Sequence, residues 1–150
     1  MSIVKTFRFP VQAHWFVGRL TRLGAPGKPP FRVATPPEFK EGIAGIWSPE
    51  ELLVGALATC YELTLAAIAE RRGIPLNTLE VGASGHVERL SGGYEFTLIE
   101  LDVELTTAPG RELEVEEVAR LAKRHCIVGR ALEVPVRVRV ETRALLPVAV

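Results

Sequence analysis

Residues 47–72 read WSPEELLVGALATCYELTLAAIAERR, a run with the start and stop signals of a single long helix. Ser48 stands at the N-cap position, and Glu51 follows it with the spacing of a capping box. Pro49 suits the first helical position, where its missing N–H group costs nothing. Gly73 comes directly after the run and is the residue type that most often ends a helix. The pattern predicts a helix that begins at Pro49 and ends near residue 72.

The first half of this helix has no polar face. Every residue from Leu52 to Tyr61 is apolar or small, so this part must be covered on all sides. A chain of 150 residues would have difficulty supplying that much cover. We therefore expect a second copy of the chain to cover part of the helix, with close approach at the small residues Gly55, Ala56 and Ala58.

The segments around the helix read mainly as strands. Apolar residues alternate with period two in most of them, and one later segment has the apolar stripe of an amphipathic helix. The predicted strands cover 3–23, 31–34, 76–89, 93–107 and 133–145, the second helix covers 112 to about 128, and 35–47 is a loop. The strands at 76–89 and 93–107 are expected to form an antiparallel hairpin joined at Ser91-Gly92-Gly93. This order predicts an α+β fold, with one domain over residues 1–150.

Composition excludes several classes of protein. The 18 basic and 18 acidic residues give no net charge, whereas a nucleic-acid binder usually carries a basic surplus. No uninterrupted apolar stretch reaches the roughly 18 residues of a membrane span. The N-terminus lacks the pattern of a secretory signal. We expect a cytoplasmic protein with no nucleic-acid or membrane partner.

Few residues are candidates for chemistry. The usual nucleotide-binding and hydrolase motifs are missing and the three histidines are scattered, so we expect no metal and no cofactor. The candidates are the two cysteines, Cys60 and Cys126, with Arg19, Arg22 and Glu50. A thiol becomes a good nucleophile when a neighbouring cation lowers its pKa, whereas burial raises the pKa. We therefore expect an arginine beside a reactive cysteine.

The order of these residues resembles a known superfamily. The run from Trp47 to Leu53 is followed by Ala58-Thr59-Cys60-Tyr61 on one apolar helix, and Cys126 lies 66 residues after Cys60 with Ala131-Leu132 and Pro135-Val136 behind it. Ala13-His14-Trp15 stands near the N-terminus. The chain resembles the OsmC/Ohr superfamily, the osmotically inducible protein C and organic hydroperoxide resistance proteins, over nearly its whole length.

The resemblance implies an intertwined homodimer with antiparallel sheets wrapped around long central helices. It also implies a thiol peroxidase that reduces organic hydroperoxides. Cys60 would attack the peroxide and Cys126 would resolve the product, while Glu50 and an arginine, Arg22 or Arg19, would hold the thiolate. The oxidised enzyme would be restored by a dithiol, which in some relatives is a lipoylated protein.

The apolar residues near Cys60 on the predicted helix, Leu53, Leu57 and Tyr61, would favour bulky organic hydroperoxides over hydrogen peroxide. The alternative is a module that binds a small hydrophobic ligand in the dimer cleft without turnover. In that case the two cysteines are buried hydrophobic residues.

Overall fold

The computed structural model describes residues 4–145, and their contacts group the chain into two compact units. The first unit ends at Leu52 and the second begins at Leu53. The single domain expected over residues 1–150 stays a prediction. Elements follow in the order β1, β2, β3, α1, β4, β5, α2, α3, β6, so the α+β class is confirmed.

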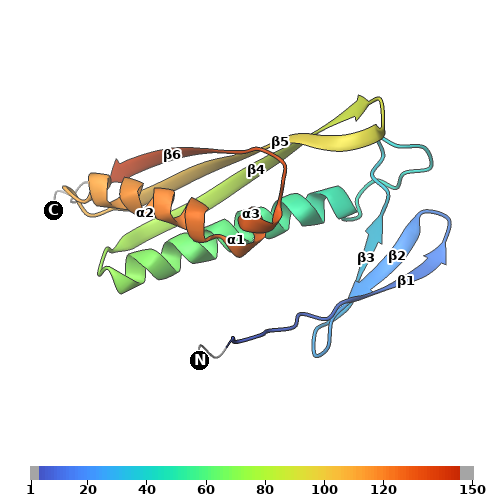
Figure 1. Ribbon diagram of the computed structural model, residues 1–150, viewed down its shortest axis with the longest axis horizontal. Coiled ribbons are helices and arrows are strands. Elements are labelled where there is room, and N and C mark those ends of the chain that lie inside the picture. The colour runs from blue at the N-terminus through green and yellow to red at the C-terminus, as the bar shows by residue number, and fades with distance from the viewer. Residues whose placement is uncertain (1–3, 146–150) are drawn as a thin grey trace. The chain divides into compact units, whose positions relative to one another are not determined.

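The N-terminal unit contains a three-stranded antiparallel sheet in the order β1-β2-β3 (Figure 1). Its strands are β1 (Gln12–Val17), β2 (Leu20–Gly24) and β3 (Phe31–Ala34). The single strand expected over residues 3–23 is therefore wrong. Gly18 adopts a left-handed φ of 55°, which only glycine does at little cost, and the chain turns back there as a hairpin.

Helix α1 (Pro49–Arg71) begins and ends as the sequence predicts. The Ser48 backbone N–H donates to Glu51 Oε2 at 2.8 Å, and the Glu51 N–H donates to Ser48 Oγ at 3.1 Å. These two bonds form the capping box. Gly73 follows with a left-handed φ of 64° and ends the helix.

The second unit packs a mixed sheet against α1 and α2, as Figure 1 shows. Strands β4 (Leu76–Leu90) and β5 (Gly93–Thr107) form the expected hairpin, and β6 (Val136–Ala144) lies on the other side of β5. We expected antiparallel sheets, but β6 runs parallel to β5. Parallel neighbours need a crossover connection, which α2 (Glu112–His125) and α3 (Ile127–Ala131) supply.

A bulge in β5 explains why its apolar alternation changes phase. His86 pairs with Leu98, but Val87 pairs with Phe96, so Thr97 is an extra residue in β5. After the bulge Ile99 faces the core and is fully buried. Opposite it, Gly85 leaves room for neighbouring side chains, since a Cβ there would lie 2.7 Å from Val54 and 2.6 Å from Phe96.

The core of this unit lies between the sheet and one side of α1. Its centre is made of buried side chains from α1, β5 and α2: Leu57, Tyr61, Leu65, Ile99, Leu101, Val103, Leu105, Val115 and Val118. Tyr61 also ties α1 to α2, because its hydroxyl donates to the Ala119 carbonyl at 3.1 Å. Burial raises the pKa of Tyr61 to about 12, with a smaller contribution from Cys126, so this hydroxyl keeps its proton.

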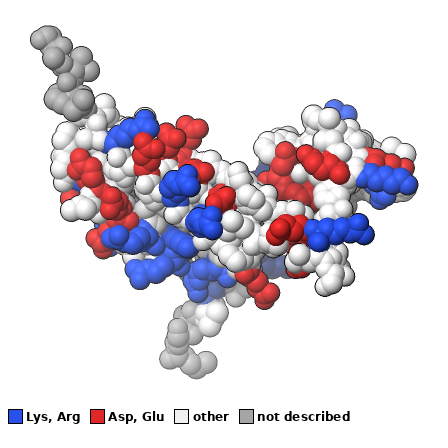
Figure 2. Space-filling view, turned by 90° about the horizontal axis from the view of Figure 1, so that it is seen from above, with Lys and Arg blue, Asp and Glu red and all other residues white. Residues whose placement is uncertain are grey.

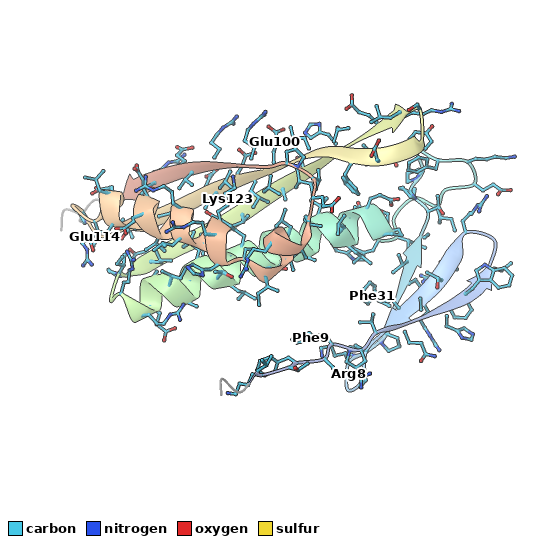
Figure 3. The ribbon with its side chains drawn as sticks, viewed as in Figure 1. Arg8, Phe9, Phe31, Glu100, Glu114 and Lys123 are labelled. Atoms are coloured by element: carbon cyan, nitrogen blue, oxygen red, sulfur yellow. The ribbon has the colours of Figure 1, made fainter. Side chains whose placement is uncertain are left out.

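The outer face of the sheet carries charges of both signs (Figure 2). Glu100 lies on this face (Figure 3), where it accepts from His86 Nε2 at 2.8 Å and Arg137 at 2.7 Å. These two hydrogen bonds lower the pKa of the Glu100 carboxyl, His86 contributing more. Interspersed charges of this kind keep a surface soluble.

Helix α1 is long and apolar enough to cross a membrane by length and composition alone, with a mean hydropathy of 1.8. A core helix of a soluble protein passes the same test of length and composition, and one third of the most apolar window of α1 is buried. The remaining apolar surface includes Leu63, which is 68% exposed. One side of α1 is therefore left uncovered by the rest of the second unit.

Candidate active site

Two cysteines from different elements meet beside α1. Cys60 lies in the middle of α1 and is half-buried, whereas Cys126 joins α2 to α3 and is buried. Both are free thiols, and their side chains are hydrogen-bonded to each other. Residues 66 positions apart in the sequence thus form one site.

Cys126 occupies a break between two helices. We expected one helix over residues 112 to about 128, but α2 ends at His125, because Cys126 is extended at φ −62° and ψ 111°. The Cys126 thiol then caps the short α3 by accepting from the Gly129 N–H at 3.4 Å. A Cβ at Gly129 would lie 3.5 Å from that sulfur and 3.4 Å from Leu57, so the site is tightly packed here.

The break exposes backbone donors to Cys60. Burial by itself raises the pKa of the Cys60 thiol, but hydrogen bonds from the Val128 N–H, the Cys126 thiol and the Ile127 N–H outweigh it. The Thr64 hydroxyl makes the smallest contribution to this lowering, because it also donates its proton to the Cys60 carbonyl oxygen, 2.7 Å from Thr64 Oγ1. The net effect lowers the pKa of Cys60 below its ordinary value.

The pKa of Cys126 moves in the opposite direction. Burial raises the pKa of Cys126, and its hydrogen bond to Cys60 and the charge of a Cys60 thiolate raise it further. The hydrogen bond from the Gly129 N–H has the opposite effect and lowers this pKa. Cys60 is therefore the more acidic of the two thiols. Two neighbouring groups whose pKa values are pushed apart have distinct roles in acid–base chemistry.

Cys60 also lines a cavity of about 910 Å³ between α1 and the α2–α3 segment. Its walls are mostly apolar, with contributions from Leu63, Ala67 and Leu121. His125 and Arg71 line it too. A half-buried thiol at an apolar cavity can meet an organic molecule without full exposure to water.

The cavity is not lined by all the residues that the sequence suggested. Leu57 and Tyr61 are each 1% exposed and belong to the core on the sheet side of α1. They point there because the sheet covers that side, so neither lines the cavity beside Cys60. Leu53 is half-buried, and its part in substrate binding stays a prediction.

Glu50, Arg19 and Arg22 all belong to the N-terminal unit. The Glu50 Oε2 atom is buried and has no hydrogen-bond partner among the described residues. Arg19 forms a 3.4 Å ion pair with Glu41, whereas the Arg22 guanidinium lies 5.6 Å over the Phe16 ring. Their roles at the thiol stay predictions.

Sequence reasoning missed the donors that lower the Cys60 pKa. We expected a cation to be required, but backbone N–H groups and the second thiol already lower it. The positions of Ile127 and Val128 depend on the helix break and carry no residue-type signal. Thr64, four positions after Cys60, could have been found from helix periodicity.

No group of three or more His, Cys, Asp or Glu side chains within residues 4–145 is arranged to hold a metal ion.

Residues 42–141 match the model of the OsmC-like protein family. The chain belongs to this family. It is 26% identical to the uncharacterized protein YmaD of Bacillus subtilis over 114 residues, covering 73% of this chain and 76% of the relative.

Solved structures of the OsmC/Ohr superfamily share the fold. An OsmC-like protein of unknown function from Vibrio cholerae has a TM-score of 0.82 at 17% identity, covering 91% of this chain and 100% of its own. An organic hydroperoxide resistance protein OsmC from Legionella pneumophila has a TM-score of 0.75 at 20% identity, covering 93% and 98%. The OsmC-like fold and the superfamily expected from the sequence are thus confirmed.

The hydrogen bonds at Cys60 predict its titration. Cys60 should be alkylated by iodoacetamide with an apparent pKa below that of an ordinary cysteine. Replacing Cys126 by Ala removes one donor and should raise the apparent pKa of Cys60. Thr64→Val should raise it less, because its donor is shared. The measurement is the alkylation rate of the Cys60 peptide against pH, by mass spectrometry.

Cys126 in the Cys60→Ser variant serves as the matched control and should react only at higher pH. An apparent pKa for Cys60 at or above that of Cys126 would contradict this account of the site.

Proposed function

We propose that this protein is a cysteine-based peroxidase that reduces organic hydroperoxides to alcohols. The observation that carries the proposal is the thiol pair, in which hydrogen bonds lower the pKa of Cys60 while burial raises that of Cys126. A nucleophile and a protonated neighbour are therefore prepared at one apolar cavity. Structural relatives named for organic hydroperoxide resistance support the same reaction class.

In the first step the Cys60 thiolate attacks the outer oxygen of the hydroperoxide, ROOH. An S–O bond forms as the O–O bond breaks, so sulfur is oxidised to a sulfenic acid and the peroxide is reduced. The leaving alkoxide takes up a proton and departs as the alcohol ROH. The hydrogen bonds that lower the Cys60 pKa keep the thiolate available for this attack.

In the second step Cys126 resolves the sulfenic acid. The Cys126 sulfur gives up its proton and attacks the Cys60 sulfur, forming the disulfide and releasing water. The influence of each thiol on the pKa of the other supports this step, since it requires the two side chains to lie close together. A dithiol, such as that of a lipoylated protein, then reduces the disulfide by exchange and is itself oxidised.

Glu50 and an arginine would add to the stabilisation of the thiolate. Glu50 is ten positions before Cys60 on the same helix, about 15 Å along its axis, so its carboxylate cannot touch that thiol. Its unpartnered Oε2 atom would accept a hydrogen bond from the guanidinium of Arg22 or Arg19, and that guanidinium would bridge to the thiolate. In the alternative arrangement, Glu50 would act on the Cys60 thiol of a second copy of the chain. Arg22→Gln should then raise the pKa of Cys60.

A homodimer would supply the missing cover of α1. The apolar side of α1 that bears Ala56, Leu63 and Ala67 is open, and burial of apolar surface contributes about 25 cal/mol per Å². Sedimentation velocity should show a dimer at micromolar concentration, and Leu63→Glu should weaken it. Leu113→Glu is the control, because Leu113 is 79% exposed on α2 and outside the cavity. A compact wild-type monomer would argue against the dimer.

The alternative function is binding of a small hydrophobic ligand without turnover. The cavity volume of about 910 Å³ and its apolar walls favour this second candidate, since such sites bind small organic molecules. The two candidates differ in one assay. A peroxidase consumes cumene hydroperoxide with dithiothreitol as the reductant, and a binding module does not.

The assigned roles predict different defects in the two cysteine variants. Cys60→Ser should reduce hydroperoxide consumption to the uncatalysed rate, because the nucleophile is lost. Cys126→Ser should permit one turnover and then accumulate sulfinic acid at Cys60 under excess peroxide. Stopped-flow consumption of peroxide and mass spectrometry of the Cys60 peptide measure these outcomes. Full activity of Cys60→Ser would refute the mechanism.

The apolar cavity predicts substrate selectivity. Each buried methylene contributes up to about 0.8 kcal/mol, about a fourfold gain in kcat/KM. Cumene hydroperoxide should therefore be reduced at least tenfold faster than hydrogen peroxide. Leu63→Ala should lower this preference, whereas Leu113→Ala should leave it unchanged. The ratio of kcat/KM within each variant is the measurement, and equal rates on both peroxides would refute the selectivity.

A further inference from the structure

The sheet of the N-terminal unit places three cationic or titratable side chains in one row. His14 on β1 pairs with Arg22 on β2, and Arg22 pairs with Arg32 on β3. Residues directly opposite each other on neighbouring strands project from the same face. Like charges in this arrangement repel and destabilise a sheet.

Carboxylates do not neutralise this row within residues 4–145. The ion pair of the N-terminal unit joins Arg19 to Glu41, and the described part of the chain shows no ion pair to Arg22 or Arg32. The Arg22 guanidinium instead lies over the Phe16 ring at 5.6 Å. A guanidinium over an aromatic ring still has N–H groups in its own plane that can bind an oxyanion.

A turn brings a further cation to the same place. Residues 25–28 read Ala-Pro-Gly-Lys, Gly27 has a φ of 73°, and the Lys28 N–H donates to the Ala25 carbonyl at 3.1 Å. These are the features of a type II turn with proline and glycine at its centre. The turn fixes the backbone at Lys28.

His14, Arg22 and Lys28 line one cavity of about 740 Å³, together with Gln12. Prolines form part of its walls, and none of its lining residues is an aspartate or glutamate. Prolines hold the cavity's backbone in place because their φ is restricted. The prolines thus preorganise the cavity, its walls carry hydrogen-bond donors, and no carboxylate side chain lines it.

From this cavity and the row of charges beside it, we propose that the N-terminal unit binds a small oxyanion with two or more negative charges. A phosphate monoester and a polycarboxylate share this chemistry. Arg22 supplies a planar donor edge, and Lys28 and Arg32 supply further positive charge, which together match such a ligand. The site uses neither cysteine, although it shares Arg22 with the proposed stabilisation of the Cys60 thiolate.

The test uses the full chain with inorganic phosphate, citrate and acetate as probes at constant ionic strength. Isothermal titration calorimetry should show binding of phosphate or citrate and much weaker binding of acetate. Backbone NMR shifts should concentrate on residues 12–14, 22–24 and 28. Binding should weaken as sodium chloride is raised, because the charges are exposed.

Variants outside the thiol site sharpen the test. Lys28→Gln and Arg32→Gln should each weaken binding about tenfold, the loss expected for one charge-assisted contact. Lys40→Gln, an exposed lysine of the same unit outside the cavity, is the matched control and should bind like the wild type. All three variants should keep the hydroperoxide turnover of the wild type.

Each outcome is decisive. Binding of phosphate alone would indicate a site for a phosphate monoester. Binding of citrate alone would indicate a site for a polycarboxylate. Binding of both would indicate that the site selects its ligand by charge and not by shape. No binding, or equal loss in the Lys40 variant, overturns the proposal. Lack of peroxidase activity leaves these binding results unaffected, so failure of the two proposals can be distinguished.

Discussion

The second unit depends on covering a helix that is apolar on nearly every side. Sheet β4–β6 covers one side of α1, where Leu57, Tyr61 and Leu65 are buried. The hydrogen bond from Tyr61 to Ala119 then fixes α2 beside α1. Because α2 is held there, its C-terminal end reaches Cys60, and the cavity between the two helices remains open on the uncovered side.

The chemical difference between the two cysteines follows from this packing. Both are buried to some degree, which disfavours a thiolate, but Cys60 receives more donors than Cys126, and one of them is the Cys126 thiol itself. These donors are available because α2 stops at Cys126 and α3 begins after it. A continuous helix would have used the same N–H groups in its own hydrogen bonds.

The N-terminal unit shows how a small sheet can concentrate charge. Its strands are short, and β1 is exposed along its whole length, so no buried face on β1 dictates the register of β1 against β2. The register nevertheless places Arg22 between His14 and Arg32. The pairing of Arg22 with Arg32 sets two cations opposite each other, which is a local conflict, and such conflicts are expected at functional sites.

Much of the fold could be predicted from the sequence wherever the sequence signal was local. The capping residues at Ser48 and Glu51, the stop at Gly73 and the hairpin after Leu90 depend on nearby residues, and all were predicted. The turn at Gly18 was missed, because apolar alternation continues through it and a lone glycine is a weak signal. The parallel pairing of β6 was also missed, because alternation predicts a strand and says nothing of its neighbour's direction.

The sequence by itself determined that Cys60 lies on a long apolar helix and that the chain resembles the OsmC/Ohr superfamily. It did not determine which groups surround the sulfur. Only the tertiary structure placed Cys126 and the N–H groups of Ile127 and Val128 at Cys60, and turned Leu57 and Tyr61 away into the core. The physical reason is that a thiol's pKa depends on burial and on nearby donors, and here those donors come from a segment more than sixty residues away.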